Sequence, residues 1–220
     1  MSIARLLRAI GMGAALALFT GTACRADSTY VASASSGSTA SGHLDFSVVV
    51  PAVLYLRIGT GNAIGGANNG TVDSMTFTVP SVHLGDGTPI AASAGSGDLG
   101  NGNVTVRIFS NVGTSVNLNS SITGQLSDGS GDTIPWSRIT VAPATLTSTT
   151  PGFVNEAIAH PAFAATSGSG TPTSLAPTSG VVAVEGKWAF AYANLDLVPA
   201  GTYGSNAAGN GVITYTVTQL

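Results

Sequence analysis

The sequence predicts an all-β protein, an antiparallel β-sandwich of about eight or nine strands joined by long loops rich in Gly, Ser and Thr. Three observations favour this fold class. Apolar and polar residues alternate with a period of two in several short segments. Thr and Val dominate these segments, and their β-branched side chains suit a pleated sheet better than a helix. Gly and Pro interrupt the chain at short intervals, and helical patterns are nearly absent.

The first expected strands lie between residues 44 and 79. Over 44–50, the residues Leu44, Phe46, Val48 and Val50 share one face. A second extended segment covers 52–58, and a third covers 72–79. A turn-rich loop with several Gly and Asn residues separates the second segment from the third.

The middle of the chain predicts four further strands, over 103–110, 115–118, 122–126 and 136–141. The long stretch 142–180 is rich in Thr, Pro, Ala and Ser and is the least regular part. Within this stretch, residues 151–160 lie between two prolines and are the only place where one or two helical turns are expected.

The last two expected strands have the clearest patterns. Over 186–194, Trp188, Phe190 and Tyr192 alternate with small alanines, which predicts an aromatic stripe in the core. Over 211–220, Ile213, Tyr215 and Val217 face one side, and threonines dominate the other.

The N-terminus predicts export. Residues 1–26 resemble a secretory signal peptide, with Arg5 and Arg8 before a short apolar stretch and small residues before Asp27. We expect a flexible arm over 27–42 and one β-sandwich domain over 43–220. Export leads to the periplasm, the cell surface or the medium, and a lipid anchor on Cys24 is the alternative. No later segment is long and apolar enough for a transmembrane helix.

Composition argues against several classes of protein. Charged residues make up 8% of the 220 residues, and the chain has one Cys. A nucleic-acid-binding protein needs a basic surface, and a disulfide scaffold or a cysteine-ligated metal site needs several cysteines. We therefore expect no nucleic-acid partner, no metal site and no cofactor.

The motifs that could carry chemistry have simpler explanations. Residues 95–100 match the dinucleotide pattern G-x-G-x-x-G, but a strand and not a helix is expected after them. The acidic sequence 128–133 is typical of a tight turn. The three histidines are far apart, and no nucleophile motif accompanies them. We expect no catalytic residues and no enzyme activity. Trp136 follows a proline at a loop edge and is a candidate for stacking on a ligand.

The closing segments resemble exported pilin-like subunits of Gram-negative bacteria, the chaperone–usher fimbrial and spore-coat-U-like proteins. The resemblance lies in Trp188-Ala-Phe-Ala-Tyr192, Pro199-Ala-Gly-Thr-Tyr203 and Gly211-Val-Ile-Thr-Tyr-Thr-Val217. It implies an Ig-like sandwich, self-association or related subunits as partners, and a periplasmic chaperone and an usher. It also implies a strand-exchange edge, for which the candidate residues are Leu44, Phe46, Val48, Ile213, Tyr215 and Val217.

The leading hypothesis is therefore an exported, non-enzymatic structural subunit of a surface filament, fimbria or coat. Two alternatives stay open at this point. One is an extracellular carbohydrate- or surface-binding module that uses Trp136. The other is a small outer-membrane β-barrel, because the strands have alternating faces.

Overall fold

The computed structural model describes residues 28–205 and 208–220. The expected signal peptide and Cys24 lie outside these residues. The chain divides into two units, one ending at Val50 and the other running from Pro51 to Leu220. The sandwich domain therefore begins at Pro51, eight residues later than the boundary expected at residue 43.

The domain consists of short and long strands with two single-turn 3-10 helices, and the described residues contain no α-helix. In chain order the elements are β1 (Leu54–Ile58), η1 (Ser81–His83), β2 (Ile90–Ala91), β3 (Asn103–Ser110), β4 (Val116–Ile122), β5 (Leu126–Ser127), β6 (Thr133–Ile134), η2 (Trp136–Arg138), β7 (Ile139–Ala144), β8 (Val154–Asn155), β9 (Gly168–Ser169), β10 (Thr173–Leu175), β11 (Val182–Tyr192) and β12 (Ile213–Gln219).

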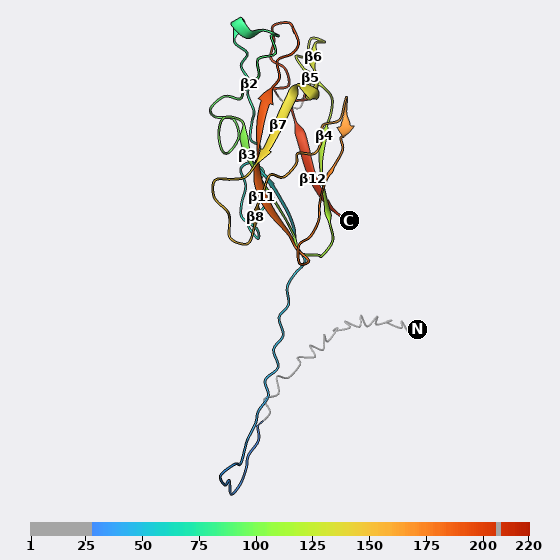
Figure 1. Ribbon diagram of the computed structural model, residues 1–220. Helices are drawn as coiled ribbons and strands as arrows, with labels where there is room; N and C mark the ends of the chain where they lie inside the picture. Colours follow the sequence, from blue (N-terminus) through green and yellow to red (C-terminus); the bar gives the residue numbers. More distant parts are fainter. Residues whose placement is uncertain (1–27, 206–207) are drawn as a thin grey trace, which may run out of the picture. The chain divides into compact units, whose positions relative to one another are not determined.

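The first sheet is built around β3 and β11 (Figure 1). β3 pairs with β1 on one side and with β11 on the other, both antiparallel. β2 pairs with the last two residues of β11. Along its other edge, β11 pairs with β7 and, in parallel, with the short β8. β1 is therefore the edge strand on one side of this sheet.

The second sheet is smaller and has β4 at its centre. β9 and β10 pair with one edge of β4, and β12 pairs with the other edge, antiparallel throughout. The core lies between the two sheets, as the period-two pattern predicts. Its fully buried members include Val106 and Ile108 from β3, Leu118 from β4 and Trp188 from β11. The predicted aromatic stripe of β11 is confirmed.

A buried ion pair lies on the outer face of the first sheet, under the segment that joins β7 to β8. Glu185 is fully buried and accepts hydrogen bonds from the Arg107 guanidinium at 2.9 Å and from the backbone N–H of Thr150. Burial raises the pKa of the Glu185 carboxyl, but the bonds from Thr150 and Arg107 outweigh this effect and hold the pKa below its ordinary value. Phe153 covers the guanidinium, with 5.1 Å between the Arg107 Cζ and the ring centroid.

Several local predictions are wrong. The strands expected over 115–118 and 122–126 are largely one strand, β4, and residues 136–138 of the strand expected over 136–141 form η2. Residues 44–50 form no strand, and their side chains are exposed. Residues 72–79 keep the expected alternation of burial, but they form only one bridge, between Phe77 and Ala92. Residues 151–160 contain no helical turn, because the backbone N–H of Glu156 donates to the carbonyl of Glu185 and draws the segment onto β11.

Gly186 provides a test of this packing. A Cβ at Gly186 would overlap the carbonyl oxygen of Glu156 and would lie 3.1 Å from that of Ala144. Since both contacts are backbone atoms, relief requires β8 to move. We expect Gly186→Ala to lower the free energy of unfolding by about 2 kcal/mol, measured by urea denaturation. The matched control is Gly70→Ala, where a Cβ meets no atom within 4 Å. Equal stability of the two variants would contradict this packing.

Candidate assembly edge

The inner faces of the two sheets are covered unequally. The inward apolar residues of the central strands are almost completely buried; they are Val104, Val106 and Ile108 on β3 and Val116, Leu118 and Ile122 on β4. Those of the edge strands are only half-buried; they are Leu56 and Ile58 on β1 and Ile213, Tyr215 and Val217 on β12. β1 and β12 approach each other, so these half-buried residues lie along one side of the sandwich.

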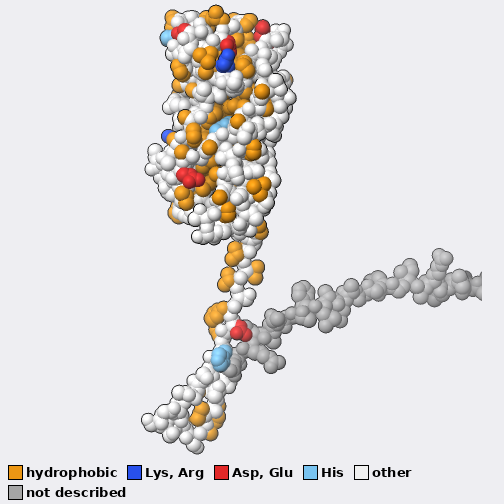
Figure 2. All heavy atoms as spheres, turned by 45° about the vertical axis from the view of Figure 1, so that its right-hand side comes forward, with side chains coloured by type: hydrophobic (Ala, Val, Ile, Leu, Met, Phe, Trp, Pro, Cys, Tyr) orange, Lys and Arg blue, Asp and Glu red, His pale blue; other side chains and the backbone are white. Residues whose placement is uncertain are grey.

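The incomplete side is visible as an apolar surface. Figure 2 turns the side that carries β4 and β12 forward, and it shows hydrophobic side chains gathered in a band along the domain. Isolated apolar residues on a protein surface are normal, and larger exposed apolar groups are candidates for a surface that another molecule or segment covers.

β12 has one neighbouring strand in the described part of the chain, which is β4. In an antiparallel pair, alternate residues direct their N–H and C=O groups away from the partner. The unpaired edge of β12 can therefore accept another strand. The outward side chains of β12 are threonines, and the inward ones are the half-buried residues of the core.

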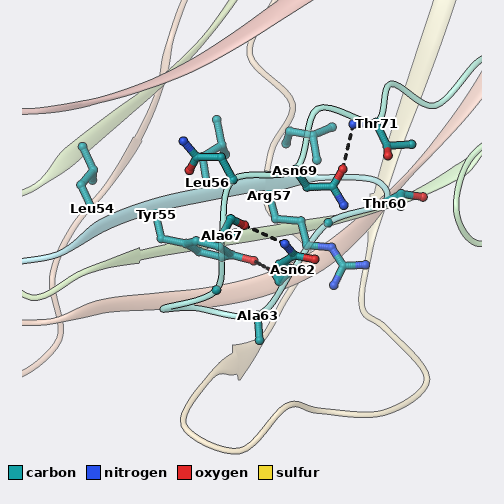
Figure 3. Close-up of a pocket in the computed structure, with 14 residues that line it drawn as sticks. Leu54, Tyr55, Leu56, Arg57, Thr60, Asn62, Ala63, Ala67, Asn69 and Thr71 are labelled. Atoms are coloured by element: carbon teal, nitrogen blue, oxygen red, sulfur yellow. Dashed lines mark hydrogen bonds between the residues drawn. The ribbon is translucent and has the colours of Figure 1, made fainter.

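β1, the edge strand of the first sheet on the same side, is flanked by the loop that follows it. The Tyr55 hydroxyl donates to the carbonyl of Asn62 at 2.6 Å, and the Asn62 amide donates to the carbonyl of Ala67 at 2.7 Å. The strand and the loop line a cavity of about 300 Å³ (Figure 3). The loop that follows β1 therefore lies beside this strand, whereas β12 pairs with β4 alone in the described part of the chain.

An aromatic cluster supports β12 from within. The Tyr215 hydroxyl lies 2.7 Å from Nε2 of His160, and the His160 ring packs edge-on against Trp188 at 4.5 Å between centroids. Phe163 lies against the other side of the cluster, 4.7 Å from the His160 ring. Burial raises the pKa of Tyr215 and lowers that of His160 to about 4, so both groups are neutral near pH 7.

The candidate edge residues predicted from the sequence fall into two groups. Ile213, Tyr215 and Val217 lie on the inward face of β12, as expected. Leu44, Phe46 and Val48 lie in the other unit of the chain. Their side chains are exposed, and their backbone forms no strand. The same alternation that fits a strand of the sandwich thus belongs to a segment outside it.

Trp136 lies in η2 and is not available for ligand stacking. Its side chain is 5% exposed, its indole N–H donates to the carbonyl of Gly124 at 2.8 Å, and its ring packs on Phe163. The sequence pattern could not distinguish this core position from an exposed loop edge.

The other sequence motifs adopt turns. The Asp128 carboxylate accepts hydrogen bonds from the backbone N–H groups of Ser130 and Asp132, as in an Asx turn. Residues 95–100 form turns that lead into β3. Residues 28–205 and 208–220 contain no group of three or more His, Cys, Asp and Glu side chains that could hold a metal ion.

Sequence reasoning missed two residues of this side. Asn111 receives the backbone N–H of Val53 on its Oδ1 at 2.7 Å and donates from Nδ2 to the carbonyl of Pro51 at 2.8 Å. His160 supports Tyr215 from a position 55 residues away. Both contacts join distant parts of the chain, and no local pattern signals them.

Comparison of the chain with protein-family models, curated proteins and solved structures finds no match. Within the described residues, no helix is long and apolar enough to cross a membrane.

The burial of His160 predicts a pH dependence. Its pKa is about 4 in the folded protein and about 6.5 when unfolded, so the unfolded chain binds the proton first as pH falls. The free energy of unfolding is therefore highest above pH 6.5. It decreases by up to about 3 kcal/mol as the pH falls from 6.5 to 4. Urea denaturation between pH 7 and 4 measures the decline.

His160→Gln removes the titrating group and should flatten this part of the profile. His43→Gln serves as the matched control, because His43 lies outside the sandwich domain, and it should keep the wild-type slope. A wild-type slope in His160→Gln would contradict the assignment.

Proposed function

We propose that the protein is an exported, non-enzymatic structural subunit that assembles with copies of itself into a surface filament, fimbria or coat. The segment 44–50 of one copy adds as a strand to the unpaired edge of β12 in the next copy. Two features of the same chain support this proposal, a sheet edge that lacks a partner strand among the described residues and a strand-like segment that lacks a sheet. One is a sandwich with a half-covered core beside β12, and the other is an exposed segment with the alternation of a core strand.

The two features match in length and pattern. The segment 44–50 has seven residues, as does β12. Its apolar face consists of Leu44, Phe46, Val48 and Val50, which are 60 to 86% exposed. Burying a large apolar side chain contributes about 1.5–3 kcal/mol, so four contribute about 6–12 kcal/mol. This is comparable to the entropic cost of association, and backbone hydrogen bonds to β12 add to it.

The low density of charge also supports close packing between copies. Each arginine of the sandwich domain forms an ion pair with an acidic side chain: Arg57 with Asp98, Arg107 with Glu185 and Arg138 with Asp196. Residues 51–220 hold eight acidic and four basic residues, a formal net charge of −4, so the repulsion between copies is modest. Before assembly, the open edge of β12 needs protection, and a periplasmic chaperone is the partner that the resemblance implies.

The carbohydrate-binding alternative loses the residue on which it depended, because Trp136 is a core residue. Export remains an expectation from the N-terminal sequence.

A matched pair of variants tests strand addition. Val48 and Val49 are neighbours of the same type and are 86% and 88% exposed, but only Val48 shares the face of Leu44, Phe46 and Val50. We expect Val48→Asp to weaken assembly at least about 30-fold, since the carboxylate would enter an apolar groove at a cost of about 2 kcal/mol or more. Val49→Asp should assemble like the wild type. Analytical ultracentrifugation and unheated SDS gels measure assembly.

Strict monomers in the wild-type protein would exclude the proposal. Equal effects of Val48→Asp and Val49→Asp would exclude a strand with one inward face. Because both residues are fully solvent-facing in the isolated chain, neither substitution should change the unfolding of the monomer.

A further inference from the structure

The described residues contain three Asn-Gly dipeptides, Asn69-Gly70, Asn101-Gly102 and Asn210-Gly211. An asparagine that precedes a glycine can react within its own chain. The backbone nitrogen of the glycine attacks Cγ of the asparagine side chain, and the absence of a Cβ on glycine leaves room for this close approach. In a folded protein, the hydrogen bonds of the attacking nitrogen and of the asparagine amide decide whether the reaction takes place.

The Asn69 side chain is folded back towards the following backbone. Its Oδ1 accepts the backbone N–H of Thr71 at 2.8 Å, which forms an Asx turn around Gly70 (Figure 3). Negative charge develops on this oxygen when Cγ is attacked, so the bond from Thr71 stabilises the transition state. Because the turn already places the side chain beside the attacking nitrogen, little further freedom is lost in the reaction.

The attacking group and the leaving group at this dipeptide are both available. Asn69 and Gly70 are exposed. Within the described residues, the Gly70 N–H and the Asn69 side-chain NH2 donate no hydrogen bond. Water can therefore take the proton from the Gly70 nitrogen and carry the released ammonia away. A Cβ built on Gly70 meets no atom within 4 Å, so the turn also has space to close into a ring.

The other two dipeptides are held by hydrogen bonds that oppose the reaction. After Asn101, the N–H of the buried Gly102 donates to the carbonyl of Ser96 at 2.9 Å. Since this nitrogen is the attacking group, its bond must break first. The leaving Nδ2 of Asn210 donates to the carbonyl of Gln125 at 3.0 Å, and its Oδ1 accepts a hydroxyl proton at 3.0 Å. These two bonds fix the amide and retain its nitrogen.

Two aspartates show that the same turn accepts a carboxylate. Asp86-Gly87 and Asp128-Gly129 form Asx turns like that of Asn69, because each carboxylate accepts the backbone N–H two residues further on at 2.8 Å. An aspartate at position 69 therefore fits the backbone that Asn69 already adopts. The two aspartates resist the same attack, since an ionised carboxylate repels the nitrogen and the N–H of each glycine is already bonded.

We propose that Asn69 is a site of spontaneous deamidation, through a succinimide formed with Gly70, and that the fold protects Asn101 and Asn210. A bond forms between the Gly70 nitrogen and Cγ of Asn69, and the bond from Cγ to Nδ2 breaks. Nδ2 leaves as ammonia with the proton of the Gly70 nitrogen. One water then opens the ring at either carbonyl and gives aspartate or isoaspartate. The inference does not depend on the proposed assembly.

The reaction changes the cavity beside β1. Asn69 and Thr71 both line this cavity, and among its described lining residues the Arg57 guanidinium is the one charged group. Aspartate or isoaspartate at position 69 adds a carboxylate to this lining. Isoaspartate also adds a carbon to the backbone of the loop that flanks β1. Deamidation therefore alters both the charge and the chain path of this loop.

Incubation of the full chain in mildly alkaline buffer tests the proposal, because hydroxide speeds the loss of the Gly70 proton. Peptide mass spectrometry measures aspartate and isoaspartate at all three dipeptides in the same sample. In the folded protein, we expect Asn69 to react at least about tenfold faster than Asn101 and Asn210. In urea the protecting bonds are absent, so the three rates should agree within about a factor of three.

Gly70→Ala is the matched variant, because a Cβ at this position meets no atom within 4 Å and the fold is retained. Its methyl group obstructs the attack, so Asn69 should react at least about tenfold more slowly than in the wild type. Equal rates at the three dipeptides of the folded protein would overturn the proposal. So would a rate at Asn69 that Gly70→Ala leaves unchanged, or reaction at Asn69 in urea alone.

Discussion

The structure depends on one constraint: the second sheet of the sandwich ends at β12, which pairs with a single strand, β4, among the residues that the structure describes. Backbone hydrogen bonds of a strand are shared with two neighbours in the middle of a sheet and with one at its edge. The inward side chains of the edge strands β1 and β12 are half-buried, whereas those of the central strands β3 and β4 are fully buried. The missing cover along β12, and not any polar cluster, is therefore the feature that most needs an explanation.

Packing and buried polar contacts hold the rest of the domain together. With no disulfide possible between described residues, rigidity comes from packing, from the aromatic cluster beneath Tyr215 and from buried polar contacts that join distant segments. Glu185 and Asn194 are examples, since each is buried and satisfied by several hydrogen bonds. Such satisfied networks fix one arrangement of the loops around the sheets.

The sequence pattern predicts the fold class and the long strands well. Apolar and polar residues alternate over most of 103–110 and 211–220, and β3 and β12 lie there. The pattern fails where a segment's partner decides its structure. Residues 44–50 have the alternation of a strand but pair with no strand among the described residues. Residues 151–160 are extended because their backbone hydrogen-bonds to β11. For the candidate site, the alternation and the resemblance predict the residues of β12 but not Asn111 or His160, whose contacts span long sequence separations.

The most direct measurement of the central claim is hydrogen–deuterium exchange at β12 in two states, the assembled wild type and the Val48→Asp monomer. If a strand joins the open edge, amides within Ile213–Gln219 that exchange fast in the monomer become protected on assembly, because they gain backbone partners. The amides of β3, already paired on both sides, should exchange alike in the two states. Unchanged exchange along β12 in the assembled protein would show that its edge is not the joining surface.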